Sequence, residues 1–319
     1  MSQRRALIVG IDAYDAFEPL ACCVDDARAM RDVLRVHWDG SRNFDCLMLT
    51  SGSRRVTLEG LRGAVEQLYA ELGGGEALFY FSGHGLADAE GGSLIVQDTP
   101  AGGPGLPMRE LLDGADRCDG SVVIILDCCH SGAIGNMVDD EGFHRAQLGE
   151  GVTILAASTA AQESHEGMLN SLFTELLLGA LDGGAADVRG RVSAASMYAY
   201  VEQSLGSWQQ RPVYKSHAKH LEALRRCEPA VPDTLLRRLP ELFEDEHARV
   251  RLDPSWEHTE AAAVAENVAR FDDFKRLRNA RLLTTEDGKD LYFVALESLS
   301  AHLTPLGRFY WRLAENGRL

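Results

Sequence analysis

The chain has 319 residues, of which 45% are hydrophobic and 25% are charged, and its net charge at pH 7 is −16. These proportions are typical of a globular protein with one large or two medium domains, and the acidity argues against a protein that binds nucleic acid over its whole surface. Seven cysteines, an odd number in a large chain, favour a reducing compartment over a disulfide scaffold. Because no apolar run approaches the roughly 18 residues of a membrane span and no signal-type segment is present, we expect a cytoplasmic protein without membrane attachment.

Strands and helices are predicted to alternate along the first two thirds of the chain. Apolar or largely apolar runs indicate strands at 6–11, 44–49, 77–81, 121–126 and 152–156, and the continuous run at 122–126 is typical of a strand buried on both faces. Helical spacing or capping signals favour helices at 25–36, 57–72, 108–112, 172–181 and 194–205. This alternation predicts right-handed βαβ units and a parallel sheet. An extended segment at 210–214 contains Pro212, which an edge strand tolerates.

The sequence changes character near Cys227. From Phe271 onward it predicts a basic helix, a turn at 287–289, a strand at 291–296 and a helix at 305–315 that begins after Thr304. This order is similar to half of a winged helix-turn-helix. We therefore predict two domains, residues 1–226 and residues 227–319, the second helical and winged-helix-like.

Reactive side chains follow two of the predicted strands. The run at 77–81 is followed by SGHG (residues 82–85), and the run at 121–126 is followed by DCCHSG (residues 127–132). In open α/β sheets, ligands bind where the carboxyl ends of parallel strands meet. If the two strands are neighbours, His84 and Cys129 lie together above the sheet. We predict a dyad in which the Cys129 thiolate is the nucleophile and His84 carries the proton.

The motifs SGHG and DCCHSG, in this order and at this spacing, resemble those of the caspase–metacaspase clan of cysteine peptidases, and they are closest to metacaspases and bacterial caspase-like proteins. ALIVGIDAY near the start, CCVDDAR at 22–28, LFTELLL at 172–178 and QRPVY at 210–214 also fit this family. The resemblance covers roughly residues 4–226. It implies a caspase-like α/β fold with a mostly parallel sheet flanked by helices. The chain departs from the family at Cys128, where Ser is usual, so that Cys129 matches the nucleophile.

The resemblance implies that His84 and Cys129 are catalytic and that the backbone N–H groups of Gly85 and Cys129 form the oxyanion hole. It also implies that Asp26 and Asp127 line the S1 pocket. Asp127 lies two residues before Cys129 at a strand end and therefore shares its side. Two carboxylates select a cation, so we predict a protein substrate cleaved after Arg, with Lys as the second candidate.

Several interpretations stay open at this stage. No cofactor is expected, and no metal, because Cys128, Cys129 and His130 are adjacent and lack the spacing of a zinc site. Calcium activation through the acidic residues 139–141 is an alternative, although a solvated loop is favoured there, and self-cleavage after Arg145 in the same loop is another. Asp25 is a candidate either to cap the following helix or to line the pocket.

Two functions from other classes compete with the peptidase. One is a catalytically idle scaffold, against which the intact His84 and Cys129 argue. The other is a DNA-binding regulator that acts through the winged-helix-like region. Residues 227–319 hold 17 acidic and 13 basic residues, so contact with an activator or adaptor protein is favoured and nucleic-acid binding is not expected. The resemblance to bacterial relatives implies a role in regulated defence, including antiviral defence, or in cell death.

Overall fold

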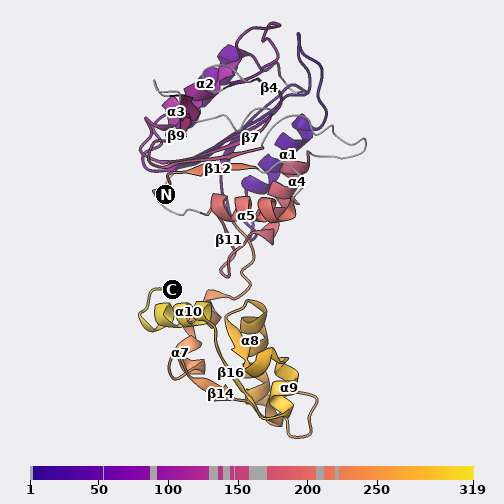
Figure 1. Cartoon of the computed structure of the whole chain (residues 1–319), viewed down its shortest axis with the longest axis vertical. Helices are drawn as coiled ribbons and strands as arrows, with labels where there is room; N and C mark the ends of the chain where they lie inside the picture. The colour runs from indigo at the N-terminus through magenta and orange to yellow at the C-terminus, as the bar shows by residue number, and fades with distance from the viewer. Residues whose placement is uncertain are drawn as a thin grey trace. The chain divides into compact units, whose positions relative to one another are not determined.

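A computed structural model describes residues 3–52, 54–86, 92–128, 136–138, 144–146, 148–157, 171–205, 212–219 and 223–319 (Figure 1). The described chain forms two compact units. The first comprises Met1–Ala186 and Arg191–Cys227, and the second comprises Asp187–Gly190 and Glu228–Leu319. The predicted boundary lies after residue 226, whereas the first unit extends to Cys227. In addition, Asp187–Gly190, which lie within the predicted first domain, belong to the second unit.

A six-stranded sheet in the order β12-β10-β7-β3-β1-β2 forms the centre of the first unit. Neighbouring strands are parallel except for β12, which runs antiparallel to β10 at one edge. The strands are β1 (Arg4–Gly10), β2 (Asp45–Thr50), β3 (Glu76–Ser82), β7 (Ser121–Asp127), β10 (Val152–Ala156) and β12 (Val213–Ser216). This arrangement confirms the predicted mostly parallel sheet. Of the predicted extended segment 210–214, Val213 and Tyr214 lie in the edge strand β12, and Pro212 directly precedes it.

Helices cover both faces of this sheet, α2 and α3 on one and α1, α4 and α5 on the other (Figure 1). Their bounds are α1 (Cys23–Leu34), α2 (Leu58–Tyr69), α3 (Met108–Ala115), α4 (Leu172–Gly179), followed by the π-helical turn η2 (Ala180–Gly184), and α5 (Ala194–Ser204). Every residue of β3 is buried. Phe79 and Phe81 point to the α2 and α3 side, and Leu78 and Tyr80 to the other, because successive side chains of a strand alternate between faces.

Short strands complete the first unit. β4 (Gly85–Leu86), β5 (Ser93–Leu94) and β6 (Leu106–Pro107) form a small antiparallel sheet directly after β3. Two further antiparallel pairs are β8 (Asn136–Val138) with β9 (His144–Ala146), and β11 (Arg191–Val192) with β13 (Arg225–Arg226).

None of the helices in the described ranges is long and apolar enough to cross a membrane.

The second unit combines helices with a three-stranded antiparallel sheet in the order β14-β16-β15. Its elements are α6 (Asp233–Arg237), α7 (Leu239–Leu242), β14 (Arg249–Arg251), η3 (Pro254–Trp256), α8 (Ala265–Asn279), β15 (Leu283–Thr285), η4 (Glu286–Gly288), α9 (Leu291–Leu296), β16 (Ser300–Leu303) and α10 (Pro305–Glu315). The predicted cap of α10 is confirmed, since the Thr304 side chain accepts from the N–H of Gly307. Buried Phe243, Phe271 and Phe274 are central to its core.

The predicted strand at 291–296 is wrong, because this segment is the helix α9. Its buried residues are Leu291, Val294 and Ala295, which follow helical rather than alternating spacing. The Asp290 side chain caps the helix by accepting from the N–H of Tyr292. The predicted turn at 287–289 therefore leads into a helix. The strand that pairs with β15 is β16, which follows this helix in the sequence.

Candidate active site

The ends of β3 and β7 lie side by side in the central sheet. Ser82, the last residue of β3, is paired in register with Asp127, the last residue of β7. The N–H of Gly83 donates to the carbonyl oxygen of Asp127 at 3.3 Å, which keeps the chains together just beyond the sheet. The segments that carry SGHG and DCCHSG thus leave the same edge of the sheet from adjacent strands.

His84 is half-buried and held by the loop that follows β1. Its Nε2 lies 2.8 Å from the carbonyl oxygen of Glu18. Because that oxygen can only accept, Nε2 carries a hydrogen in this arrangement, and Nδ1 of the neutral ring is the proton acceptor. The imidazole also packs against the rings of Tyr14 and Phe17, with centroid distances of 4.8 and 6.0 Å. The ring therefore has a defined position and a defined tautomer.

Tyr14 also fixes the backbone of the histidine. Its hydroxyl accepts from the N–H of His84 at 2.9 Å and donates to the carbonyl oxygen of Ile11 at 3.0 Å. Burial raises the pKa of this phenol, so the hydroxyl keeps its proton for the second hydrogen bond. A Cβ at Gly83 would lie 2.7 Å from the same hydroxyl, which explains why glycine precedes the histidine.

Asp127 is bound by two hydroxyl groups at the start of α4. The hydroxyls of Ser171 and Thr174 both donate to its Oδ2, the second at 2.7 Å. The Thr174 hydroxyl in turn lies 2.5 Å from the hydroxyl of buried Tyr80. Burial raises the pKa of Asp127 above its ordinary value, although these hydrogen bonds oppose the rise.

Asp26 lies close to the same elements, but its side chain is fully buried. Its Oδ2 accepts from the hydroxyl of Ser82, and its Oδ1 accepts from the N–H of Ser171, both at 3.0 Å. Asp26 and Asp127 are thus brought together through Ser171. The sequence did not single out Ser171, although a serine before an apolar helical run is a typical N-cap signal.

Asp25 neither caps α1 nor lies with Asp26 and Asp127. It is in the first turn of α1 and forms an exposed ion pair with Arg28 at 2.7 Å. The amide donors of this helix start are bound instead by Asp12, whose Oδ1 accepts from the N–H of Cys23 at 2.8 Å. A carboxylate from a distant loop therefore replaces the local cap, which sequence spacing does not reveal.

The other predicted residues are placed in part. Gly85 is buried in β4 and pairs with Leu94 of β5, which holds the backbone just after His84. Cys129 lies outside the described residues, as do the acidic residues 139–141. Arg145 lies in β9, where its backbone pairs with Met137. Within the described ranges, no group of three or more His, Cys, Asp or Glu side chains is arranged to hold a metal ion.

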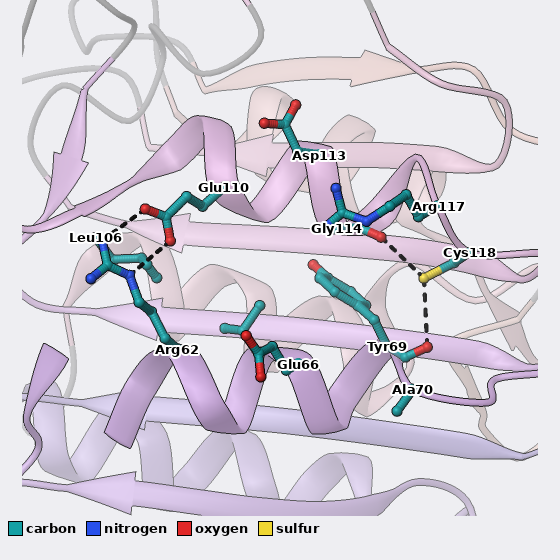
Figure 2. A pocket seen from close by; sticks show the side chains of 11 residues that line it. Arg62, Glu66, Tyr69, Ala70, Leu106, Glu110, Asp113, Gly114, Arg117 and Cys118 are labelled. Atoms are coloured by element: carbon teal, nitrogen blue, oxygen red, sulfur yellow. Dashed lines mark hydrogen bonds and ion pairs between the residues drawn. The ribbon is translucent and has the colours of Figure 1, made fainter. Parts of the chain in front are cut away.

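A separate pocket of about 380 Å³ lies between α2 and α3. Figure 2 shows Arg62 of α2 reaching Glu110 of α3, and their two hydrogen bonds measure 2.9 and 2.8 Å. Tyr69 and Cys118 also line this pocket, and burial raises the pKa of the Cys118 thiol. None of the predicted site residues that the structure describes lines it, so it is distinct from the candidate active site.

In the second unit, ion pairs occupy two residues of the predicted basic helix. Lys275 lies 3.4 Å from Asp272 and 3.9 Å from Glu257, and Arg278 lies 2.8 Å from Asp290. These pairs lower the local positive charge that a DNA backbone would need.

Comparison with known proteins identifies the family. Residues 3–222 match the family described as the caspase domain, so the chain belongs to that family, whose members are cysteine-type endopeptidases. A structure titled pro-sf-caspase-1 is 13% identical, covers 70% of this chain and 92% of its own, and has a TM-score of 0.48. Caspase-1 from Spodoptera frugiperda is 14% identical, with coverages of 71% and 91% and a TM-score of 0.46. No curated protein matches the chain. The predicted family and its caspase-like α/β fold with a C-terminal helical region are confirmed.

Proposed function

We propose that this caspase-family protein is an endopeptidase that uses a Cys129–His84 dyad to cleave proteins after Arg, with Lys as the second candidate. The observation that carries the proposal is the pairing of Ser82 with Asp127 at the ends of adjacent parallel strands. Because of this register, the segments that contain His84 and Cys129 begin at neighbouring positions on one edge of the sheet.

The tautomer of His84 supports its role as the base. With Nε2 bonded to the Glu18 carbonyl oxygen, Nδ1 is the nitrogen that takes the proton from the Cys129 thiol. The thiolate sulfur attacks the substrate carbonyl carbon, and the backbone N–H groups of Gly85 and Cys129 stabilise the oxyanion. His84 then protonates the leaving amine, a thioester forms, and water hydrolyses it to release the acid and restore the thiol.

The preference for a basic residue follows from the acids near the strand ends. Asp26 and Asp127 are both linked to Ser171, which places two acidic side chains at the ends of adjacent strands. Paired carboxylates attract a substrate guanidinium or ammonium group. That cation, or a protonated His84, also offsets the rise in thiol pKa that a nearby carboxylate causes.

The test is cleavage of fluorogenic peptides that differ only in Arg, Lys or Asp at P1. We expect cleavage after Arg by the wild type, none by Cys129→Ala or His84→Ala, and undiminished cleavage by the matched control Cys118→Ala, because Cys118 lies at the α2–α3 pocket. Preference for Asp at P1 would refute the assignment of the two acids. Full activity of Cys129→Ala would refute the nucleophile.

Cofactor independence, a protein partner for residues 227–319, a cytoplasmic location and a role in regulated defence or cell death stay predictions of the sequence. The peptide assay with and without calcium, or with a chelator, examines the first of these directly. Activity that requires added calcium would contradict a cofactor-free peptidase.

A further inference from the structure

Ser171 connects the two acids of the candidate site. Its backbone N–H donates to Asp26 and its hydroxyl donates to Asp127. The same hydroxyl accepts from the N–H of Thr174 at 3.2 Å and thereby caps α4. One side chain therefore ties the orientation of both carboxylates to the first turn of a helix that is packed against the sheet.

The two carboxylates differ in what they can offer a substrate. Asp26 is fully buried and uses both oxygens within the protein, one for Ser171 and one for Ser82. Asp127 is only partly buried, and the hydroxyl groups of Ser171 and Thr174 both end on its Oδ2, so Oδ1 receives neither. The Asp127 carboxylate is therefore held through Oδ2 by two hydroxyl groups from the first turn of α4.

We propose that Ser171 is a positioning residue that holds the plane of the Asp127 carboxylate for an arginine side chain at P1. This proposal rests on the cleavage after basic residues proposed above. Arginine presents a planar set of donors that must match the plane of the carboxylate, whereas a lysine ammonium is a point charge that tolerates rotation. Loss of the Ser171 hydroxyl therefore affects arginine more than lysine.

The experiment compares Ser171→Ala, Ser171→Thr and wild type on peptides with Arg or Lys at P1. We expect Ser171→Ala to raise KM for the Arg peptide about tenfold and for the Lys peptide less than about threefold, with kcat nearly unchanged. Ser171→Thr keeps a hydroxyl at this position and is expected to restore the Arg preference. If Ser171→Ala does not fold, Thr174→Val removes the other hydroxyl that donates to Oδ2, and we expect the same change in the Arg to Lys ratio.

Ser193→Ala is the matched control. Ser193 caps α5 by accepting from the N–H of Ser196, as Ser171 caps α4, but none of its described hydrogen bonds reaches Asp26 or Asp127. We expect it to lower thermal stability about as much as Ser171→Ala and to leave both KM values unchanged.

The outcomes separate the two proposals. A wild type that cleaves neither basic peptide overturns the proposed function. A wild type that prefers Arg, together with a folded Ser171→Ala that keeps the same KM values and ratio, overturns the positioning role alone. An equal rise of KM in Ser193→Ala also overturns it, because the effect would then follow from helix stability.

Discussion

Replacing Tyr14 by phenylalanine removes one oxygen and keeps the ring that packs against His84. In the described part of the chain that oxygen makes two hydrogen bonds, one from the N–H of His84 and one to the carbonyl oxygen of Ile11. A hydrogen bond contributes about 1 kcal/mol net, so Tyr14→Phe is expected to lower the free energy of unfolding by about 2 kcal/mol. For a unit of this size that corresponds to a fall of about 4–8 °C in the thermal midpoint.

The catalytic effect follows from the same contact. If about 1.4 kcal/mol of the loss is felt at the positioned His84, kcat/KM on the Arg peptide falls about tenfold. Thermal unfolding followed by circular dichroism measures the first effect, and peptide cleavage at a temperature well below the midpoint measures the second.

Two other tyrosines provide graded controls. The Tyr80 hydroxyl has one described hydrogen-bond partner, Thr174, so Tyr80→Phe is expected to cost about 1 kcal/mol. The Tyr69 hydroxyl is buried and has no hydrogen-bond partner within the described residues. Because an unsatisfied buried hydroxyl is unfavourable, Tyr69→Phe should be neutral or stabilising by about 1 kcal/mol. Equal losses for Tyr14→Phe and Tyr69→Phe would refute the reasoning, and an unchanged kcat/KM for Tyr14→Phe would refute the positioning of His84.

Three further results are expected. Asp26→Asn should cost about 2–4 kcal/mol in urea unfolding. Ser82 and Ser171 donate to different oxygens of this fully buried side chain, and an amide nitrogen cannot accept, so one donor loses its partner; a loss below about 1 kcal/mol would contradict this. Burial raises the pKa of Asp127 above its value of 3.8 in the unfolded chain, so the folded state keeps this proton longer and stability falls as pH rises from that value through the raised pKa. Asp127→Asn should flatten that fall, and a pH profile identical to wild type would count against it. Phe274→Ala removes a fully buried ring of the second unit and should lower the free energy of unfolding of that unit by about 3–5 kcal/mol. Peptide cleavage should persist, and its loss at temperatures where the first unit stays folded would contradict this prediction.

The repetition of apolar runs and helical spacing predicted most of the first unit correctly. Strand and helix signals are local, and a strand buried on both faces has a continuous apolar sequence wherever it lies in the sheet. The apolar segment 291–296 shows where such signals fail. A short run with no charged residue fits either a strand or a helix. The elements packed around this segment determine that Leu291, Val294 and Ala295 are its buried side chains, and this spacing is helical.

By itself, the sequence determined the family, the order of the main strands and helices of the first unit, and the two motifs that follow predicted strands, because each of these depends on residues close together in the chain. The tertiary structure decided what surrounds them. Ser171 reaches acids 145 and 44 positions away, Asp12 caps a helix in place of Asp25, and the Glu18 carbonyl oxygen sets the tautomer of His84. Hydrogen bonds between distant residues depend on the path of the folded backbone, and no local pattern of residue types records that path.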